Sequence, residues 1–175
     1  VLGMDAEVIE DVLNGREGVS IANYNCPGQI VITGEAAAVA EAGTALKEAG
    51  ARRVLPLKVS GPFHSPMMRP AGEELAKVFA RVSMNPLKIP YVANINAEVI
   101  TDCGRIEGLL VEQVSGSVRW QQSVETMIRE WVDTFVEIGP GKTLTGFLRK
   151  IDKNVKAYHI GSWEEAVQVL SLIHI

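Results

Sequence analysis

The stretch VSGPFHSPMM, residues 59–68, divides the chain into two parts with different patterns. It follows an apolar run at 54–59 and holds His64, one of three histidines, between Pro62 and Pro66. Proline fixes its own φ and biases the preceding residue away from the helical region, so a strand is expected to pass here into a stiff, extended turn. An imidazole held in one orientation suits a general base, although spacing alone favours a histidine that merely closes the turn.

Residues 1–59, before this histidine, alternate between strand and helix patterns. Apolar side chains recur at helical spacing after Asp5, and Pro27-Gly28 supplies turn chemistry within 24–28. The expected order is strand, helix, strand, strand, helix, strand, over residues 1–2, 5–13, 19–23, 29–33, 35–49 and 52–59. This order predicts a ferredoxin-like βαββαβ unit whose first strand is cut short.

Beyond the histidine, strands and helices alternate again. Helices are expected at 66–82, 106–114, 121–130, 143–151 and 164–170, and strands at 89–94, 134–138 and 157–160. Such alternation favours the α/β class with a parallel sheet, here as part of a larger unit over residues 60–170. Residues 171–175 fit neither a helix end nor a loop, and we expect them to be a non-native tail.

The composition narrows the class of protein. With 175 residues and 47% hydrophobic content, the chain can bury a substantial core. A net charge of −4 gives no electrostatic basis for binding nucleic acid or an anionic membrane. Cys26 and Cys103 lack metal-ligand spacing and fit a reducing cytoplasm. No apolar run approaches the ~20 residues that cross a bilayer, so we expect a cytoplasmic protein without a metal site.

Local motifs leave the chemistry open. The sequence contains no G-x-S-x-G, P-loop, G-x-G-x-x-G or H-E-x-x-H motif. Ser60 and Ser65 flank His64, but the side chains of sequence neighbours point in different directions, which argues against a serine–histidine pair. The polar run 23–25 would either cap a hairpin or face a substrate. Taken alone, these residues indicate a cytoplasmic α/β domain with one conspicuous histidine.

Four segments together carry more information than any one of them. They are NYNCPGQIVITG (23–34), LPLKVSGPFHSPMMRPA (55–71), VANINAEVI (92–100) and EIGPGKTLTG (137–146). In this order and spacing they resemble the malonyl-CoA:acyl-carrier-protein transacylases and the acyltransferase domains of fatty-acid and polyketide synthases. The resemblance extends over nearly the whole chain, up to the tail.

This resemblance implies an α/β-hydrolase-like core, residues 60–170, that carries a ferredoxin-like subdomain, residues 1–59. It also implies ping-pong acyl transfer in fatty acid biosynthesis, with malonyl-CoA as substrate and no cofactor. A serine on a G-H-S-L-G elbow would take malonyl from coenzyme A and pass it to the phosphopantetheine thiol of acyl carrier protein.

The resemblance also assigns roles to individual residues. His64 would be the base, and the main-chain carbonyl of Gln113 would accept from its second ring nitrogen in place of an aspartate. Phe63 resembles the form linked to malonyl selectivity, because a bulky ring would crowd the α-methyl group of methylmalonyl; ordinary packing is the alternative. Asn25 would lie near the mouth of the acyl or pantetheine channel.

Three residues of the family pattern are missing from the sequence. The nucleophilic serine, the oxyanion-hole glutamine and the arginine that pairs with the malonyl carboxylate would all lie upstream of Val1. We therefore expect a C-terminal fragment of a monomeric enzyme, inactive by itself. Two alternatives stay open at this point, an internal slice of a synthase and a stand-alone binding module that uses the βαββαβ unit without catalysis.

Overall fold

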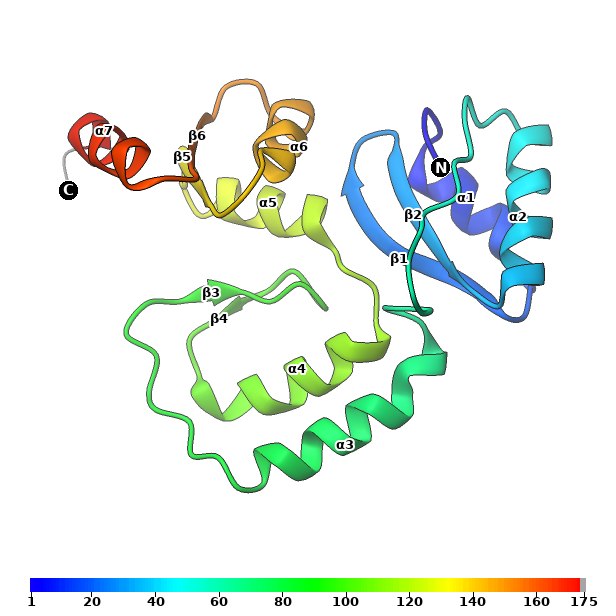
Figure 1. Cartoon of the computed structure of the whole chain (residues 1–175), viewed down its shortest axis with the longest axis horizontal. Coiled ribbons are helices and arrows are strands. Elements are labelled where there is room, and N and C mark those ends of the chain that lie inside the picture. The colour runs from blue at the N-terminus through cyan, green and yellow to red at the C-terminus, as the bar shows by residue number, and fades with distance from the viewer. Residues whose placement is uncertain (174–175) are drawn as a thin grey trace.

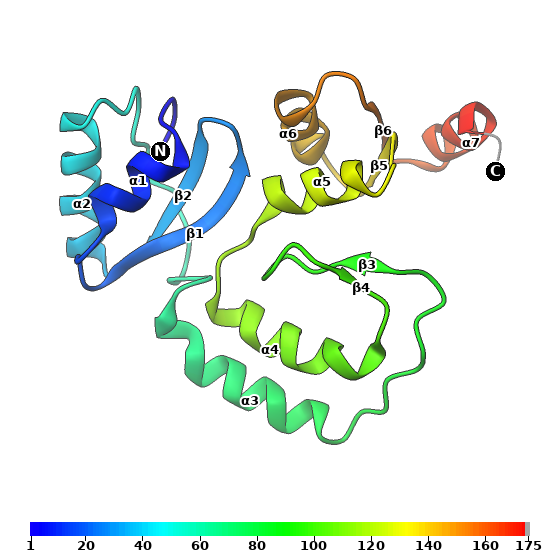
Figure 2. The same cartoon turned by 180° about the vertical axis from the view of Figure 1, so that it is seen from behind.

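The computed structural model describes residues 1–173. Its elements form three groups in chain order, which Figures 1 and 2 show from opposite sides. The first, which we call the N-terminal unit, comprises residues 1–53. It holds α1 (Ala6–Leu13), β1 (Val19–Cys26), β2 (Gln29–Gly34) and α2 (Ala36–Glu48).

The N-terminal unit is a hairpin covered by two helices. The helical spacing predicted for α1 is confirmed, and it turns Ile9 and Leu13 into the core. β1 and β2 pair antiparallel, with Cys26 opposite Gln29. The predicted loop at 24–28 is wrong, because β1 continues to Cys26 and only a two-residue turn remains. Both Tyr24 and Cys26 are buried, so the inward face of the strand extends further than its polar sequence suggests.

The first and last strands expected in this unit, at 1–2 and 52–59, are each present only as a single bridge residue. Leu2 pairs antiparallel with Gln29 on one side and with Arg53 on the other. The pairing order across the unit is therefore Arg53, Leu2, β2, β1. The predicted strand at 52–59 is wrong beyond Arg53. The chain from 54 to 59 runs without a strand assignment, and Pro56 interrupts its amide donors.

The middle group is a helix pair with a short hairpin. It contains η1 (Pro66–Met68), α3 (Arg69–Phe79), β3 (Tyr91–Val92), β4 (Val99–Ile100), η2 (Cys103–Arg105) and α4 (Ile106–Ser115). α3 and α4 approach closely at Gly72, where an added Cβ would lie 3.0 Å from the Val111 carbonyl oxygen. The strand expected at 89–94 is reduced to two residues by the prolines before it, and its partner β4 was not predicted.

The last group carries a parallel strand pair. It contains α5 (Trp120–Arg129), β5 (Thr134–Ile138), α6 (Thr143–Ile151), β6 (Lys156–Ile160) and α7 (Trp163–Ile173). β5 and β6 pair in parallel from Thr134↔Lys156 to Ile138↔Ile160, as the α/β pattern predicted. α7 continues to Ile173, so residues 171–173 form the end of a helix that the sequence pattern did not predict. That residues 171–175 are a non-native tail stays a prediction. Positions 174–175 of that predicted tail lie outside the described residues.

Candidate active site

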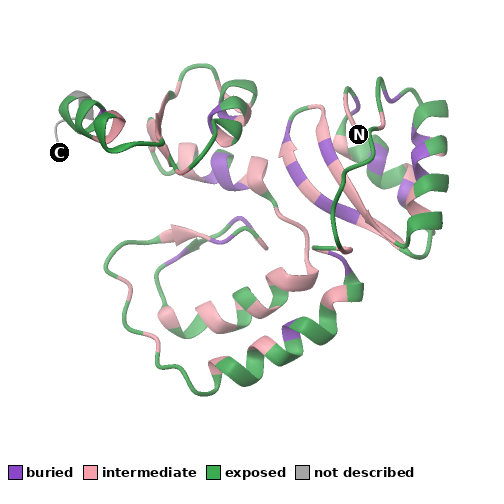
Figure 3. Ribbon diagram, viewed as in Figure 1, coloured by how far each residue is buried: buried purple, intermediate pink, exposed green. Residues whose placement is uncertain are grey.

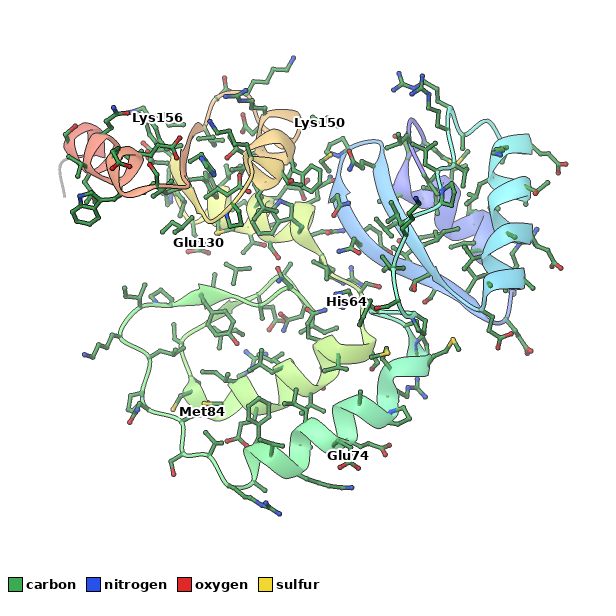
Figure 4. The ribbon with its side chains drawn as sticks, viewed as in Figure 1. His64, Glu74, Met84, Glu130, Lys150 and Lys156 are labelled. Carbon is green, nitrogen blue, oxygen red and sulfur yellow. The ribbon has the colours of Figure 1, made fainter. Side chains whose placement is uncertain are left out.

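His64 lies between the N-terminal unit and the C-terminal end of α4 (Figure 4). Its φ is +59°, in the left-handed region that costs a non-glycine residue about 1–2 kcal/mol. The next residue holds this conformation. Ser65 is 1% exposed, its hydroxyl donates to the Pro62 carbonyl at 2.7 Å, and its own carbonyl accepts from Met68 N at 2.9 Å. Strain maintained by buried hydrogen bonds is typical of functional positions.

The imidazole meets a carbonyl that the helix leaves free. The last turn of α4 contains a bond from Gly116 N to the Glu112 carbonyl, 2.9 Å long. The following carbonyl, that of Gln113, belongs to the helix end, where carbonyls lack an amide partner one turn further on. It lies 3.1 Å from Nδ1 of His64. A carbonyl oxygen can only accept, so this contact requires Nδ1 to carry the proton and leaves the lone pair of a neutral ring on Nε2.

The two other residues assigned by resemblance occupy different surroundings. Phe63, beside His64 in sequence, is 49% exposed. Asn25 is half-buried near the end of β1, where the register with β2 shifts between Tyr24 and Cys26. Among the described residues, no hydrogen bond connects the Asn25 side chain to His64 or Gln113. The structure thus brings His64 and Gln113 together and leaves Asn25 on the N-terminal unit.

Residues 116–119, which lead from α4 to α5, pair with β1 by backbone hydrogen bonds. The sequence did not reveal this pairing. Tyr24 N donates to the Val118 carbonyl at 2.9 Å, and Val118 N donates to the Ala22 carbonyl at 2.7 Å. The Ser117 hydroxyl donates to the Ile21 carbonyl at 2.6 Å. A single parallel bridge, Asn23↔Val118, is too short to leave a periodic pattern. This segment ties the end of α4 to the N-terminal unit.

Tyr24 and Cys26, the reactive side chains of β1 nearest this junction, are held in protonated forms. Burial and a 2.6 Å hydrogen bond to Glu10 Oε1 raise the pKa of Tyr24 to about 12, although Arg119 above its ring, 5.6 Å from the centroid, opposes the shift. Burial likewise raises the pKa of the Cys26 thiol. Neither side chain is suited to act as a base or a nucleophile near neutral pH.

The carboxylate of Glu137, at the end of β5, accepts hydrogen bonds from the first turn of α6, across the glycine-proline turn at 139–141. Burial alone would raise the pKa of Glu137, but three hydrogen bonds outweigh it and lower the pKa. They come from Thr145 Oγ1 at 2.6 Å, Thr145 N at 2.7 Å and Leu144 N at 3.1 Å. Glu137 therefore caps the helix with a carboxylate, as the helix dipole favours. The loop at 139–142 is a strand-to-helix turn.

Residues 1–173 contain no group of three His, Cys, Asp or Glu side chains arranged to bind a metal ion. None of the helices in this range has the length and hydrophobicity that crossing a membrane requires.

Residues 2–169 match the sequence pattern of the acyl transferase domain. The chain belongs to the acyl transferase domain family. It is 42% identical over 177 residues to the malonyl CoA-acyl carrier protein transacylase of Bacillus subtilis, covering 97% of this chain and 56% of the relative. It is 38% identical over 169 residues to the Staphylococcus aureus enzyme of the same name, covering 94% and 55%.

Solved structures are also similar to this chain over nearly its whole length. The chain superposes on MCAT from Streptococcus pneumoniae with a TM-score of 0.93 at 42% identity, covering 98% of this chain and 57% of that chain. A malonyl-transacylase in complex with a type II PKS acyl-carrier protein gives 0.91 at 36% identity, covering 98% and 57%. The present chain thus spans little more than half the length of these relatives.

Proposed function

We propose that this chain is the C-terminal part of a malonyl-CoA:acyl-carrier-protein transacylase and supplies its general base. The observation that carries the proposal is the 3.1 Å contact between His64 Nδ1 and the Gln113 carbonyl. It holds the ring in the tautomer whose Nε2 can accept a proton. The identity to the malonyl CoA-acyl carrier protein transacylases of B. subtilis and S. aureus supports malonyl transfer as the reaction, which we assign to fatty acid biosynthesis.

The reaction would proceed in two balanced halves. Nε2 of His64 accepts the proton of a serine hydroxyl while the serine oxygen attacks the thioester carbonyl of malonyl-CoA. The C–S bond then breaks, and the imidazolium returns the proton to the departing coenzyme A thiolate. In the second half, His64 deprotonates the phosphopantetheine thiol of acyl carrier protein, the sulfur attacks the seryl ester, and the serine oxygen regains the proton.

The serine must come from outside these 175 residues, which contain no G-x-S-x-G motif. The same holds for the oxyanion-hole and carboxylate-binding groups. The Gln113 carbonyl would stabilise the imidazolium in each half-reaction through its partial negative charge, in the position that a carboxylate occupies in a full triad.

We assign selectivity to Phe63 and a channel position to Asn25. The Phe63 ring precedes the base and is half-exposed, so it is available to crowd an α-methyl branch on the acyl group. Asn25 stands on β1, the strand joined to the end of α4 through Val118. Acyl carrier protein would be the partner, in line with the relative solved with its carrier protein. We further propose that the whole enzyme is monomeric and cytoplasmic.

We assign the architecture in the same way. The pairing order Arg53, Leu2, β2, β1 is that of a ferredoxin-like sheet, which supports a subdomain at residues 1–59. The parallel β5–β6 pair with its flanking helices supports residues 60–170 as part of an α/β-hydrolase-like core. Residues 171–175 are assigned to neither.

A chimeric protein tests the proposal. Residues 2–169 replace the matching part of the B. subtilis transacylase, and malonyl transfer from malonyl-CoA to acyl carrier protein is measured. We expect an active chimera that loses about 10²–10⁴-fold in kcat on His64→Ala, the usual contribution of a general base. Met67→Ala, a half-exposed neighbour, serves as the control and should retain activity.

The 175-residue chain alone should transfer no malonyl, because its sequence holds no nucleophile elbow. An active chimera that is insensitive to His64→Ala would overturn the assignment of the base. A folded but inactive chimera would favour a binding module that kept the family scaffold. Transfer only in the context of a larger synthase would favour a synthase domain.

A further inference from the structure

The side chain of Gln113 is used as well as its main chain. Its Nε2 donates to the Gly116 carbonyl at 2.9 Å and lies 3.4 Å from the Ser117 carbonyl. It also lies 3.5 Å from Nδ1 of His64. A primary amide has two N–H donors, and both have carbonyl acceptors here. The contact with the imidazole therefore joins two nitrogens that donate elsewhere, and it is packing rather than a hydrogen bond.

The amide oxygen of Gln113, in contrast to its nitrogen, makes no hydrogen bond within the described residues. This oxygen, Oε1, is buried. Burying an unpaired amide oxygen is unfavourable, and an apolar side chain of similar length would avoid this penalty. The side chain is thus held in place through its donors, and these point to the turn after α4.

The two carbonyls that the amide contacts begin the segment 116–119, which pairs with β1. This segment is confined from several sides. Val118 exchanges backbone hydrogen bonds with Ala22 and Tyr24, and Arg119 N donates to the Asn94 carbonyl at 2.8 Å. At Gly116 an added Cβ would lie 2.2 Å from Ile95 Cδ1. The amide therefore connects the end of α4 to a backbone that is already fixed.

We propose that the side-chain amide of Gln113 is a positioning group for His64. By holding the Gly116 and Ser117 carbonyls, it fixes the end of α4, and with it the direction of the Gln113 main-chain carbonyl toward Nδ1. Without the amide, the last turn of the helix is free to fray, and the ring loses the acceptor that selects its tautomer. This role rests on the proposed function of His64 as the base.

The test uses Gln113→Met in the B. subtilis chimera, with Gln122→Met as the matched control. Gln122 is also half-buried and also has a buried side-chain oxygen without a partner in the described range, but it lies on α5. The first readout is the ¹⁵N spectrum of labelled histidine rings, with the His64 signals assigned from their loss in His64→Ala. The second is the separation of kcat from KM for malonyl-CoA.

We expect the parent chimera and the control to show one His64 tautomer, protonated on Nδ1. In Gln113→Met the two ring-nitrogen shifts should converge as the tautomers average. The kcat should fall about 10- to 100-fold, a part of the ~10²–10⁴-fold that general-base catalysis contributes, while KM changes less than about twofold. A single unchanged tautomer with unchanged kcat, or equal losses in Gln122→Met, would refute the role.

A second variant covers the case in which Gln113→Met does not fold, and the ring spectra separate this proposal from the proposed function of His64. If Gln113→Met does not fold, Ser117→Ala loosens the same segment by removing its 2.6 Å bond to Ile21. It should produce the same signature at smaller amplitude, and an unchanged spectrum and kcat would overturn the proposal. If His64→Ala leaves the chimera active, the proposed function fails, while the ring spectra still decide whether the amide of Gln113 sets the tautomer.

Discussion

The N-terminal unit and residues 54–173 differ in how completely they cover their apolar side chains (Figure 3). In the N-terminal unit, helices and hairpin enclose one contiguous core. Its members, all at most 9% exposed, are Met4, Ile9, Leu13, Ile21, Tyr24, Ile30, Ala42, Leu46 and Ala51. In residues 54–173, large apolar side chains stay open to solvent, with Trp131 93%, Ile138 79% and Ile89 77% exposed.

The N-terminal unit thus buries its core side chains with its own residues, whereas residues 54–173 leave large apolar side chains exposed. The extended stretch at 54–59 presents Leu55, Leu57 and Val59, each more than half exposed, although its sequence is that of a buried strand. A strand needs a partner as well as a pattern, and the described residues supply none beyond Arg53. His64, the proposed base, belongs to residues 54–173, which we call the open region. It contacts the Gln113 carbonyl at the end of α4, and Val118, just beyond that end, pairs with Asn23 of the N-terminal unit.

The largest effect should come from a core deletion in the N-terminal unit. Leu46→Ala removes a side chain that is 0% exposed and should lower the free energy of unfolding by about 3–5 kcal/mol, through lost burial and the cavity left behind. Leu57→Ala, at a position 60% exposed, should change it by less than about 0.5 kcal/mol. Urea unfolding followed by circular dichroism measures both free energies, and similar losses would mean that the two regions depend equally on their leucine side chains.

Two glycines provide a smaller and better matched contrast. Gly34 in the N-terminal unit and Gly139 in the open region have φ of +144° and +138°. An added Cβ at Gly34 would lie 1.9 Å from the Gly18 carbonyl oxygen, whereas at Gly139 it would meet nothing within 4 Å.

Gly34→Ala should therefore cost about 3 kcal/mol, from backbone strain and overpacking together. Gly139→Ala should cost about 1–2 kcal/mol, from strain alone. Thermal and urea unfolding of the two variants decide between these values. Equal costs would mean that the hairpin relaxes as readily as the open loop.

The smallest effect concerns acid sensitivity in the open region. The pKa of Glu137 is lower in the folded chain than its usual value of 4.5. Its stabilising contribution is thus complete above about pH 4.5 and is lost as the pH falls through the folded value. Glu137→Gln should be less stable than the parent at pH 7, and the difference should shrink below pH 4.5.

The control for that change is Glu130→Gln, which removes one exposed charge from the same region. Unfolding curves at pH 7, 5, 4 and 3 measure the pH dependence of each variant. A constant difference between Glu137→Gln and the parent, or the same pH dependence in both variants, would contradict the capping role.

Much of the secondary structure follows from short-range patterns. The bounds predicted for β5 and α6 are those observed, because the apolar run TFVEI and the glycine-proline turn after it permit few alternatives. Where the predicted bounds were wrong, contacts with residues distant in the sequence, or their absence among the described residues, set the observed bounds. β1 extends to Cys26 because its inward side chains are covered. Residues 54–59 lack strand pairing because no described segment exchanges ladder hydrogen bonds with them.

Local residue patterns were enough to predict the α/β class, the order of most elements and the presentation of His64 between two prolines, although not β4. These depend on side-chain periodicity and on backbone restrictions that act within a few residues. No local pattern predicts that the Gln113 carbonyl meets Nδ1 across 49 positions, which the sequence indicated by family resemblance alone, or that the Ser117 hydroxyl meets Ile21 across 96 positions, which the folded chain revealed. Such contacts depend on where a helix ends relative to a remote strand, and that is fixed by packing rather than by any local pattern.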